Sequence, residues 1–247
     1  MIRAIRTLAL IIAVSGLGMP FAKAAEAVDL LLVLAADVSR SVDHVKFKLQ
    51  REGYAAAIAD RQVLEAISSG MHQRIALCFV EWSGSSSQKV LIEWTVIGDA
   101  AAARQFGDRL LEAPRAFADR TSISGGLEFA MAQLDRAPFQ ATRRTIDVSG
   151  DGTNNSGRDV ALVRDQVVEK GVTINGLVIL SERAIPWNPE HTNPPGGLAK
   201  YYRDNVMGGP GAFVIVAQDF NDFGQAIVKK LVAEIAMLPA AQTVPAR

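Results

Sequence analysis

The feature that most constrains the fold is a nearly continuous apolar run, "VDLLLVLAA", at residues 28–36. A strand without an alternating polar face is typical of a parallel sheet that is covered on both sides. Further strand-like runs, most of them separated by amphipathic stretches, lie at 74–83, 88–97, 143–150, 172–181 and 212–217. The sequence therefore predicts an α/β fold with a doubly wound, mostly parallel six-stranded sheet and helices on both faces.

One pair of strands is expected to be antiparallel. The runs at 74–83 and 88–97 are joined by "GSSS", which is too short for a crossover helix and suits a hairpin. A helix is predicted from about Ser41, a plausible N-cap, to about Ala59. The Pro- and Gly-rich stretch from Glu182 to Gly211 is predicted to be a long ordered excursion before the last strand.

The first 24 residues have the pattern of a secretory signal peptide. Arg3 and Arg6 precede an apolar core from Leu8 to Met19, and Ala22-Lys23-Ala24 has the small-x-small pattern of a cleavage site. A retained signal anchor is the alternative, but a spanning helix needs about 20 apolar residues. We therefore expect a periplasmic or secreted protein that has no membrane span after cleavage.

The mature chain is predicted to be a single domain at 25–238, followed by a disordered tail at 239–247. The whole chain has 26 basic and 26 acidic residues, and loss of the signal would leave 23 basic against 26 acidic. No Lys/Arg cluster then remains to suit a phosphate backbone, so nucleic acid is not an expected partner. Cys78 is the single cysteine, which excludes an intrachain disulfide, and we expect it to be a small buried hydrophobe.

Polar side chains gather in three loops that are expected at the carboxyl ends of strands, where open α/β sheets bind ligands. The loops are Asp37–Ser41, the pair Thr121 and Ser122, and Ser149–Gly152. They contain carboxylates and hydroxyls but no His or Cys. Such an all-oxygen set suits Mg²⁺ or Mn²⁺ and suits Zn²⁺ or Cu²⁺ poorly.

The motifs "DVSRS" at 37–41, "RTSISGGLEFA" at 120–130 and "SGDG" at 149–152 resemble the metal-ion-dependent adhesion site of von Willebrand factor type A domains. The resemblance covers about residues 28–237. It implies that an ion, Mg²⁺ or Mn²⁺, is held by five side chains, partly through water, namely Asp37, Ser39, Ser41, Thr121 and Asp151. It also implies that an acidic residue of a protein partner takes the open coordination position.

The chain more narrowly resembles a group of uncharacterised exported bacterial proteins that carry this domain. The likeness rests on "LQREGYAAAIAD", "VEWSG", "DVSGDGTNNSG" and "TINGLVI". Two features depart from the wider pattern, since Arg120 adds a positive charge beside the threonine and Arg40 lies inside the first motif. Arg40 either pairs with an acid or attracts an acidic partner.

Other readings of these motifs remain open at this point. Asp37 and Ser41 could serve only as helix caps, and the domain could be purely structural, with an ion that makes its loops rigid. A magnesium-dependent hydrolase is the third alternative. Against it, the sequence has no phosphate-binding G-x-x-x-x-G-K-[ST] loop, no G-x-S-x-G elbow and no general base within the motifs, so we expect a protein that is not an enzyme.

Several polar residues near the motifs are assigned other roles. Asn154 and Asn155 are predicted to form a turn, Glu81 to be a buried partner or a rim residue, and Trp82 to be core. Surface or capping roles are expected for Asp43, Asp147 and Asp159. The three histidines, His44, His72 and His191, have no ligand spacing, so a histidine metal site is not expected. The sequence predicts neither the identity of the partner nor the oligomeric state.

Overall fold

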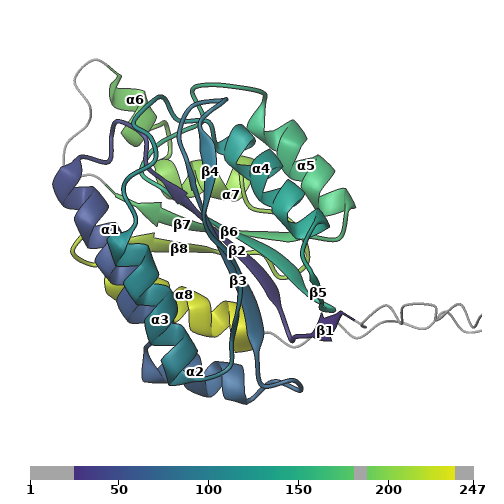
Figure 1. The fold of residues 1–247 in the computed structure, drawn as a ribbon. Helices are drawn as coiled ribbons and strands as arrows, with labels where there is room; N and C mark the ends of the chain where they lie inside the picture. Colours follow the sequence, from purple (N-terminus) through teal and green to yellow (C-terminus); the bar gives the residue numbers. More distant parts are fainter. Residues whose placement is uncertain (1–24, 181–187, 237–247) are drawn as a thin grey trace, which may run out of the picture.

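The structure is a computed structural model, and it describes residues 25–180 and 188–236. Its centre is a sheet of six strands in the order β4-β3-β2-β6-β7-β8 (Figure 1). All neighbouring strands are parallel except β3 and β4, which form the predicted antiparallel hairpin. The strands are β2 (Leu31–Asp37), β3 (Ile75–Trp82), β4 (Gln88–Ile97), β6 (Arg144–Gly150), β7 (Thr173–Ile179) and β8 (Val214–Ala217). The predicted fold class is confirmed.

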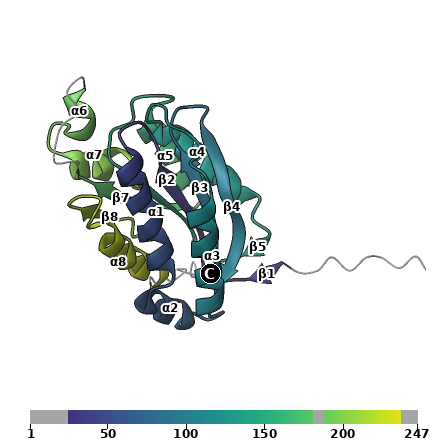
Figure 2. The ribbon, with the colours of Figure 1, turned by 60° about the vertical axis from the view of Figure 1, so that its left-hand side comes forward.

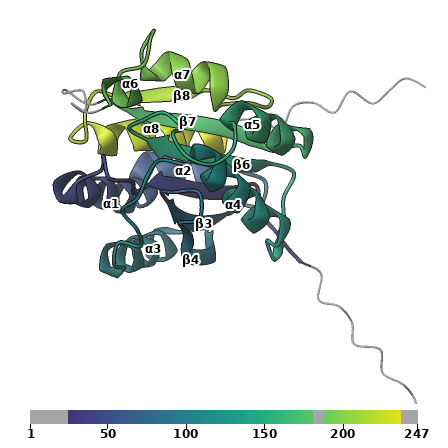
Figure 3. The ribbon, with the colours of Figure 1, turned by 90° about the horizontal axis from the view of Figure 1, so that it is seen from above.

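Helices cover both faces of the sheet, as the view from above shows (Figure 3). One face packs against α1 (His44–Ile58), α2 (Arg61–Ser68), α3 (Ala100–Glu112) and α8 (Phe223–Ala236). The other face packs against α4 (Ile123–Asp135), α5 (Val160–Glu169) and α7 (Leu198–Asn205). None of the helices in the described residues has the length and apolar character needed to cross a bilayer.

The apolar run that begins the fold serves both cores at once. Leu32 and Leu34 of β2 face the core of α1, α3 and α8, whereas Val33 and Ala35 face the core of α4 and α5. Successive side chains of a strand point to opposite faces, so a strand covered on both sides must be apolar throughout. This explains why the run has no polar alternation.

Cys78 of β3 is buried, as predicted, and burial raises the pKa of its thiol to about 12. Since the thiolate is the reactive form, this cysteine acts as a packing residue. Trp82, at the end of the same strand, is fully buried in the core, as predicted.

One expectation about local structure needs correction. Helix α1 begins at His44, and its N-cap is Asp43, which accepts a hydrogen bond from the Lys46 amide, so Ser41 does not cap it. In the described part of the excursion predicted at 182–211, residues 188–211, the chain forms helices α6 (Pro189–Thr192) and α7. The signal peptide and tail predictions, at 1–24 and 239–247, fall outside the described residues.

A second, two-stranded parallel pair lies apart from the main sheet. It joins β1 (Glu26–Ala27) to β5 (Phe139–Gln140), near the amino ends of β2 and β6. Figure 2 shows this pair at the end of the molecule opposite α6. The carboxyl ends of the parallel strands, and with them the predicted site, therefore lie at the α6 end.

Candidate functional site

The first and third predicted loops meet because their strands are neighbours. Asp37 ends β2, Asp151 directly follows β6, and the two strands pair up to Ala36 and Ser149. Ser41 Oγ donates a hydrogen bond of 2.5 Å to Asp151 Oδ1. Asp37 Oδ1 accepts the Ser39 amide at 2.7 Å, and the Ser39 and Ser41 hydroxyls are 3.1 Å apart. The structure thus brings four of the five predicted residues into one hydrogen-bonded network.

Thr121, the fifth residue, is not hydrogen-bonded to these four, but it is bound to the loop after β6 that contains Asp151. Its amide donates to Asn155 Oδ1 at 3.0 Å, and the Asn155 amide donates back to the Thr121 carbonyl at 2.9 Å. Asn154 Oδ1 likewise accepts the Ser124 amide, at the start of α4. The two asparagines therefore tie the loop after β6 to the threonine loop, a role beyond the turn predicted for them.

The two carboxylates are buried near each other, so the charge of one disfavours ionisation of the other. Asp37 and Asp151 are fully buried, and Asp37 Oδ2 has no hydrogen-bond partner among the described residues. Burial, followed by the nearby charge of Asp151, raises the pKa of Asp37 to about 8. A buried carboxylate beside a second carboxylate is stabilised either by a proton or by a nearby positive charge.

The residues present fit a divalent ion. Within the described residues, no three His, Cys, Asp or Glu side chains form a metal-binding group, so an ion here depends on the serine and threonine hydroxyls. Two carboxylates and three hydroxyls are the oxygen donors that Mg²⁺ and Mn²⁺ accept. Gly150 contributes space, because a Cβ there would lie 3.1 Å from Asp37 Oδ2 and 2.5 Å from the Tyr202 hydroxyl.

Arg115 fixes the shape of the first loop, and sequence reasoning missed it. Its Nη2 donates to the carbonyls of Val38 at 2.6 Å, Ser39 at 2.9 Å and Val42 at 2.8 Å. Because one guanidinium group binds three carbonyls of the loop, it restricts the conformation of the loop. The two arginines singled out in the sequence are peripheral, since Arg120 is exposed and Arg40 lies 3.9 Å from Asp119 at the surface.

Lys46 forms an ion pair with Asp151, one of the two carboxylates of the network. Its Nζ lies 3.4 Å from Asp151 Oδ2 and donates to the Ser41 carbonyl at 2.9 Å. The lysine side chain is 26% exposed, so it approaches Asp151 from the solvent side. Because α1 begins just after the first motif, the sequence places this lysine at the site, but no pattern in the sequence distinguishes it from a surface lysine.

His191 of α6 also lies at the site, although the histidines have no ligand spacing in the sequence. Its Nε2 is 3.2 Å from Thr121 Oγ1, and its backbone carbonyl accepts the Thr153 amide at 2.8 Å. Burial lowers the pKa of the imidazole. The sequence could not place His191 here, because spacing along the chain does not reveal a contact between residues 70 positions apart. The absence of a histidine metal site stays a prediction.

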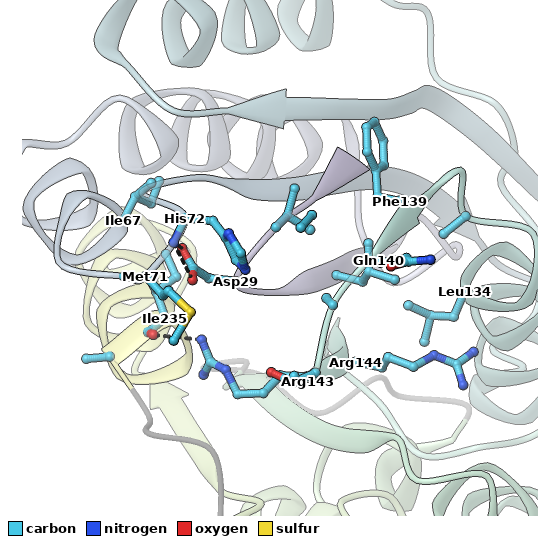
Figure 4. Close-up of a pocket in the computed structure, with 18 of the residues that line it drawn as sticks. Asp29, Ile67, Met71, His72, Leu134, Phe139, Gln140, Arg143, Arg144 and Ile235 are labelled. Carbon is cyan, nitrogen blue, oxygen red and sulfur yellow. Dashed lines mark hydrogen bonds between the residues drawn. The ribbon is translucent and has the colours of Figure 1, made fainter. Parts of the chain in front are cut away.

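A large pocket lies at the opposite end of the sheet. It has a volume of about 1000 Å³ and is lined by both apolar and charged residues, including Leu134, Phe139, Arg143 and Ile235 (Figure 4). Arg143 is already engaged there, since it donates to the carbonyls of Glu234 at 2.7 Å and Ile235 at 2.9 Å, at the end of α8. None of the predicted site residues lines this pocket.

Comparison with solved structures identifies the class of fold as the von Willebrand factor type A domain. A von Willebrand factor type A protein from Catenulispora acidiphila matches 85% of this chain and 42% of its own length, with a TM-score of 0.52 and 15% identity. The pilus adhesin SpaC from Lactobacillus rhamnosus GG matches 87% of this chain and 31% of its own, with a TM-score of 0.57 and 12% identity. Proximal thread matrix protein 1 from the mussel byssus, in a structure with a zinc-occupied adhesion-site motif, matches 86% and 47%, with a TM-score of 0.56 and 12% identity.

The sequence also matches one protein family, which is a smaller group than all the proteins that share this fold. The model described as "Protein of unknown function (DUF1194)" matches residues 27–239, and the chain belongs to this family. No curated protein matches the sequence. The chain spans less than half the length of the three solved proteins above, and at these identities they establish the fold alone.

Proposed function

We propose that this chain is an exported domain that binds another protein in a manner dependent on a divalent ion, Mg²⁺ or Mn²⁺. The ion would be held by Asp37, Ser39, Ser41, Thr121 and Asp151. The observation that carries the proposal is the unpartnered oxygen of Asp37, fully buried beside Asp151. An ion bound there would take the place of the proton that burial favours on Asp37 and would stabilise both carboxylates in their ionised form.

Charge favours an acidic group on the partner. A divalent ion balances the two aspartates, and Lys46 and Arg115 then leave the site positive overall. Ser41 is the only one of the five side chains that is not fully covered, so a partner would approach from its side, where Lys46 also lies. A carboxylate from a partner would complete the coordination and meet this positive surface.

The test is calorimetric titration of Mg²⁺ and Mn²⁺ into the metal-free protein and into Asp37→Ala and Asp151→Ala. We expect saturable binding that is lost in both variants. Asp43→Ala is the matched control, because Asp43 caps α1 beside the site but does not belong to the network. It should cost about 1 kcal/mol of stability and leave ion binding intact. Absence of binding to the unaltered protein at millimolar ion would refute the proposal.

Partner binding needs its own measurement. A peptide library with a fixed glutamate should bind in Mg²⁺ and be released by EDTA, whereas the same library with a fixed glutamine should not bind. A structural ion is the second candidate, which the burial of four of the five side chains favours. In that case, Mg²⁺ would raise the melting temperature while neither library bound.

Lys46 provides a test of the charge balance at the site. Its ammonium group lies 3.4 Å from Asp151 Oδ2, where it competes with an ion for the same carboxylate. Lys46→Gln is therefore expected to tighten Mg²⁺ binding by about three- to tenfold, a modest change because the side chain is partly exposed and screened. Lys48→Gln, two residues further along and well exposed, should leave affinity unchanged. Weaker binding in Lys46→Gln would contradict this account of the site.

A further inference from the structure

Tyr202 of α7 brings a fully buried hydroxyl to the candidate site. The residue has no exposed surface, and its hydroxyl has no hydrogen-bond partner among the described residues. A buried tyrosine usually finds a partner for its O–H, because an unsatisfied polar group in the interior is costly. The surroundings of this hydroxyl therefore need an explanation.

Two glycines make room for the Tyr202 side chain. A Cβ on Gly150 of β6 would lie 2.5 Å from the Tyr202 hydroxyl, and a Cβ on Gly176 of β7 would lie 3.0 Å from the ring carbon Cδ1. Neither glycine is among those with positive φ, so the backbone conformation does not require them. Their lack of a side chain instead allows the phenol to reach the carboxyl end of β6.

The space at Gly150 places the Tyr202 hydroxyl beside Asp37. The same Cβ position is 3.1 Å from Asp37 Oδ2, the carboxylate oxygen that has no partner among the described residues. Two unpartnered buried oxygens therefore lie beside one missing side chain. Burial, followed by the charges of Asp37 and Asp151, raises the pKa of the Tyr202 phenol well above its usual value. The hydroxyl thus keeps its proton and can donate it.

Helix α7 also contacts the loop after β6 through the preceding residue. The Asn154 amide donates a hydrogen bond of 3.1 Å to the Tyr201 hydroxyl. Two consecutive tyrosines of α7 therefore lie against the candidate site, one at its loop and one beneath Asp37. The sequence assigns neither to the site, because the helix follows a Pro- and Gly-rich stretch far from the motifs.

We propose that Tyr202 is a positioning residue of the ion site, whose hydroxyl donates to Asp37 Oδ2, directly or through one water, when an ion is bound. This inference rests on the proposed function, because it needs the same ion. An ionised carboxylate oxygen has lone pairs for both an ion and a hydrogen bond. Hydrogen bonds to ionised groups are roughly twice as strong as those between neutral groups. The hydroxyl therefore contributes more with the ion bound than without it.

The first experiment is calorimetric titration of Mg²⁺ into Tyr202→Phe, which keeps the ring and removes one oxygen. We expect Mg²⁺ affinity to fall by about tenfold, the loss of one hydrogen bond to a charged group. The denaturation midpoint of the metal-free variant should not fall, because the removed hydroxyl has no partner among the described residues. Unchanged Mg²⁺ affinity, or a midpoint that falls equally with and without Mg²⁺, would overturn the proposal.

Tyr54→Phe is the matched control, since it also removes one fully buried phenol hydroxyl. Tyr54 lies on the other face of the sheet, where its hydroxyl donates to Ser149 Oγ at 3.0 Å. This variant should show the opposite pattern, with a lower denaturation midpoint and unchanged Mg²⁺ affinity. Equal losses of Mg²⁺ affinity in both variants would show that the effect does not depend on Tyr202.

The second experiment follows the hydroxyl in the unaltered protein by NMR of the full chain labelled with ¹³Cζ-tyrosine. The chain has three tyrosines, and the Tyr202 signal is the one absent from Tyr202→Phe. We expect it to shift on Mg²⁺ binding by more than the other two. A Tyr202 signal that stays in place at saturating Mg²⁺ would refute the proposal and leave the ion site standing. Failure of the unaltered protein to bind Mg²⁺ or Mn²⁺ would refute the ion site itself, and this inference with it.

Discussion

Replacement of Lys230 by methionine is expected to lower the free energy of unfolding by about 3–5 kcal/mol, because it leaves buried carboxylates without their cation. Lys230 of α8 is fully buried, with Nζ 2.8 Å from Asp147 Oδ1 and 2.5 Å from Glu234 Oε1. Asn175 Nδ2 also donates to Glu234 Oε1, at 2.8 Å. One lysine therefore contacts both acids in the space between the sheet and α8. Chemical denaturation at pH 8 measures the loss.

The stability lost in Lys230→Met should depend on pH in a definite direction. Burial raises the pKa of Asp147 to about 7, with Lys230 opposing the rise. An acid whose folded pKa lies above its unfolded value contributes stability at low pH and loses it as the pH rises through the folded value. The deficit of Lys230→Met should therefore be largest near pH 8 and shrink toward pH 5.

A matched variant separates charge from packing. Adding Asp147→Asn and Glu234→Gln to Lys230→Met removes both uncompensated charges while keeping the volume, so most of the lost stability should return. If the triple variant is as unstable as Lys230→Met, the loss comes from packing of the lysine chain and the charge account is wrong.

Replacement of Arg51 by methionine is expected to cost a similar amount, about 3–5 kcal/mol. Arg51 of α1 donates to Glu81 Oε1 at 3.0 Å through Nε and at 2.5 Å through Nη2, and both residues are buried. It also donates to the Leu110 carbonyl at the end of α3. Its removal leaves the Glu81 carboxylate in the core and the carbonyl unsatisfied.

The Arg51→Met change should also alter the candidate ion site. Glu81 Oε2 accepts the amide of Ala116, which is next to Arg115, and Arg115 holds the loop after Asp37. We expect Arg51→Met to weaken ion binding as well as stability. Lys48→Met, an exposed change on the same helix, should alter stability by no more than about 0.5 kcal/mol. Unchanged ion affinity in folded Arg51→Met would show that the two regions are independent.

The sequence predicts the architecture well because short, local sequence patterns determine the strands and their connections. The continuous apolar run of β2 predicts burial on both faces, and the short "GSSS" connection predicts the hairpin. The Asp37 and Asp151 loops could also be placed together, because each follows a parallel strand and such ends share one edge of the sheet. The assignment of the ion to the five residues stays a prediction.

The buried charges could not be predicted in the same way. A surface or capping role was expected for Asp147, and this is wrong, since it is fully buried beside Lys230. Lys230 and Glu234 are four residues apart in α8, which is also the spacing of an exposed helical ion pair. Only the packing of α8 on the sheet decides between these two environments. Glu81, for which both roles were left open, is the buried partner of Arg51.

The position of the candidate site between β2 and β6 has a consequence for how the protein folds. Ala36 pairs with Ser149, more than a hundred residues further along the chain, whereas the other neighbour of β2, strand β3, is much nearer in sequence. Contacts between such distant segments close large loops and form slowly. A partly folded chain that has only the β2–β3–β4 half would hold Asp37 without Asp151. Capture of an ion by both aspartates would therefore have to wait until β6 has joined β2 in the sheet.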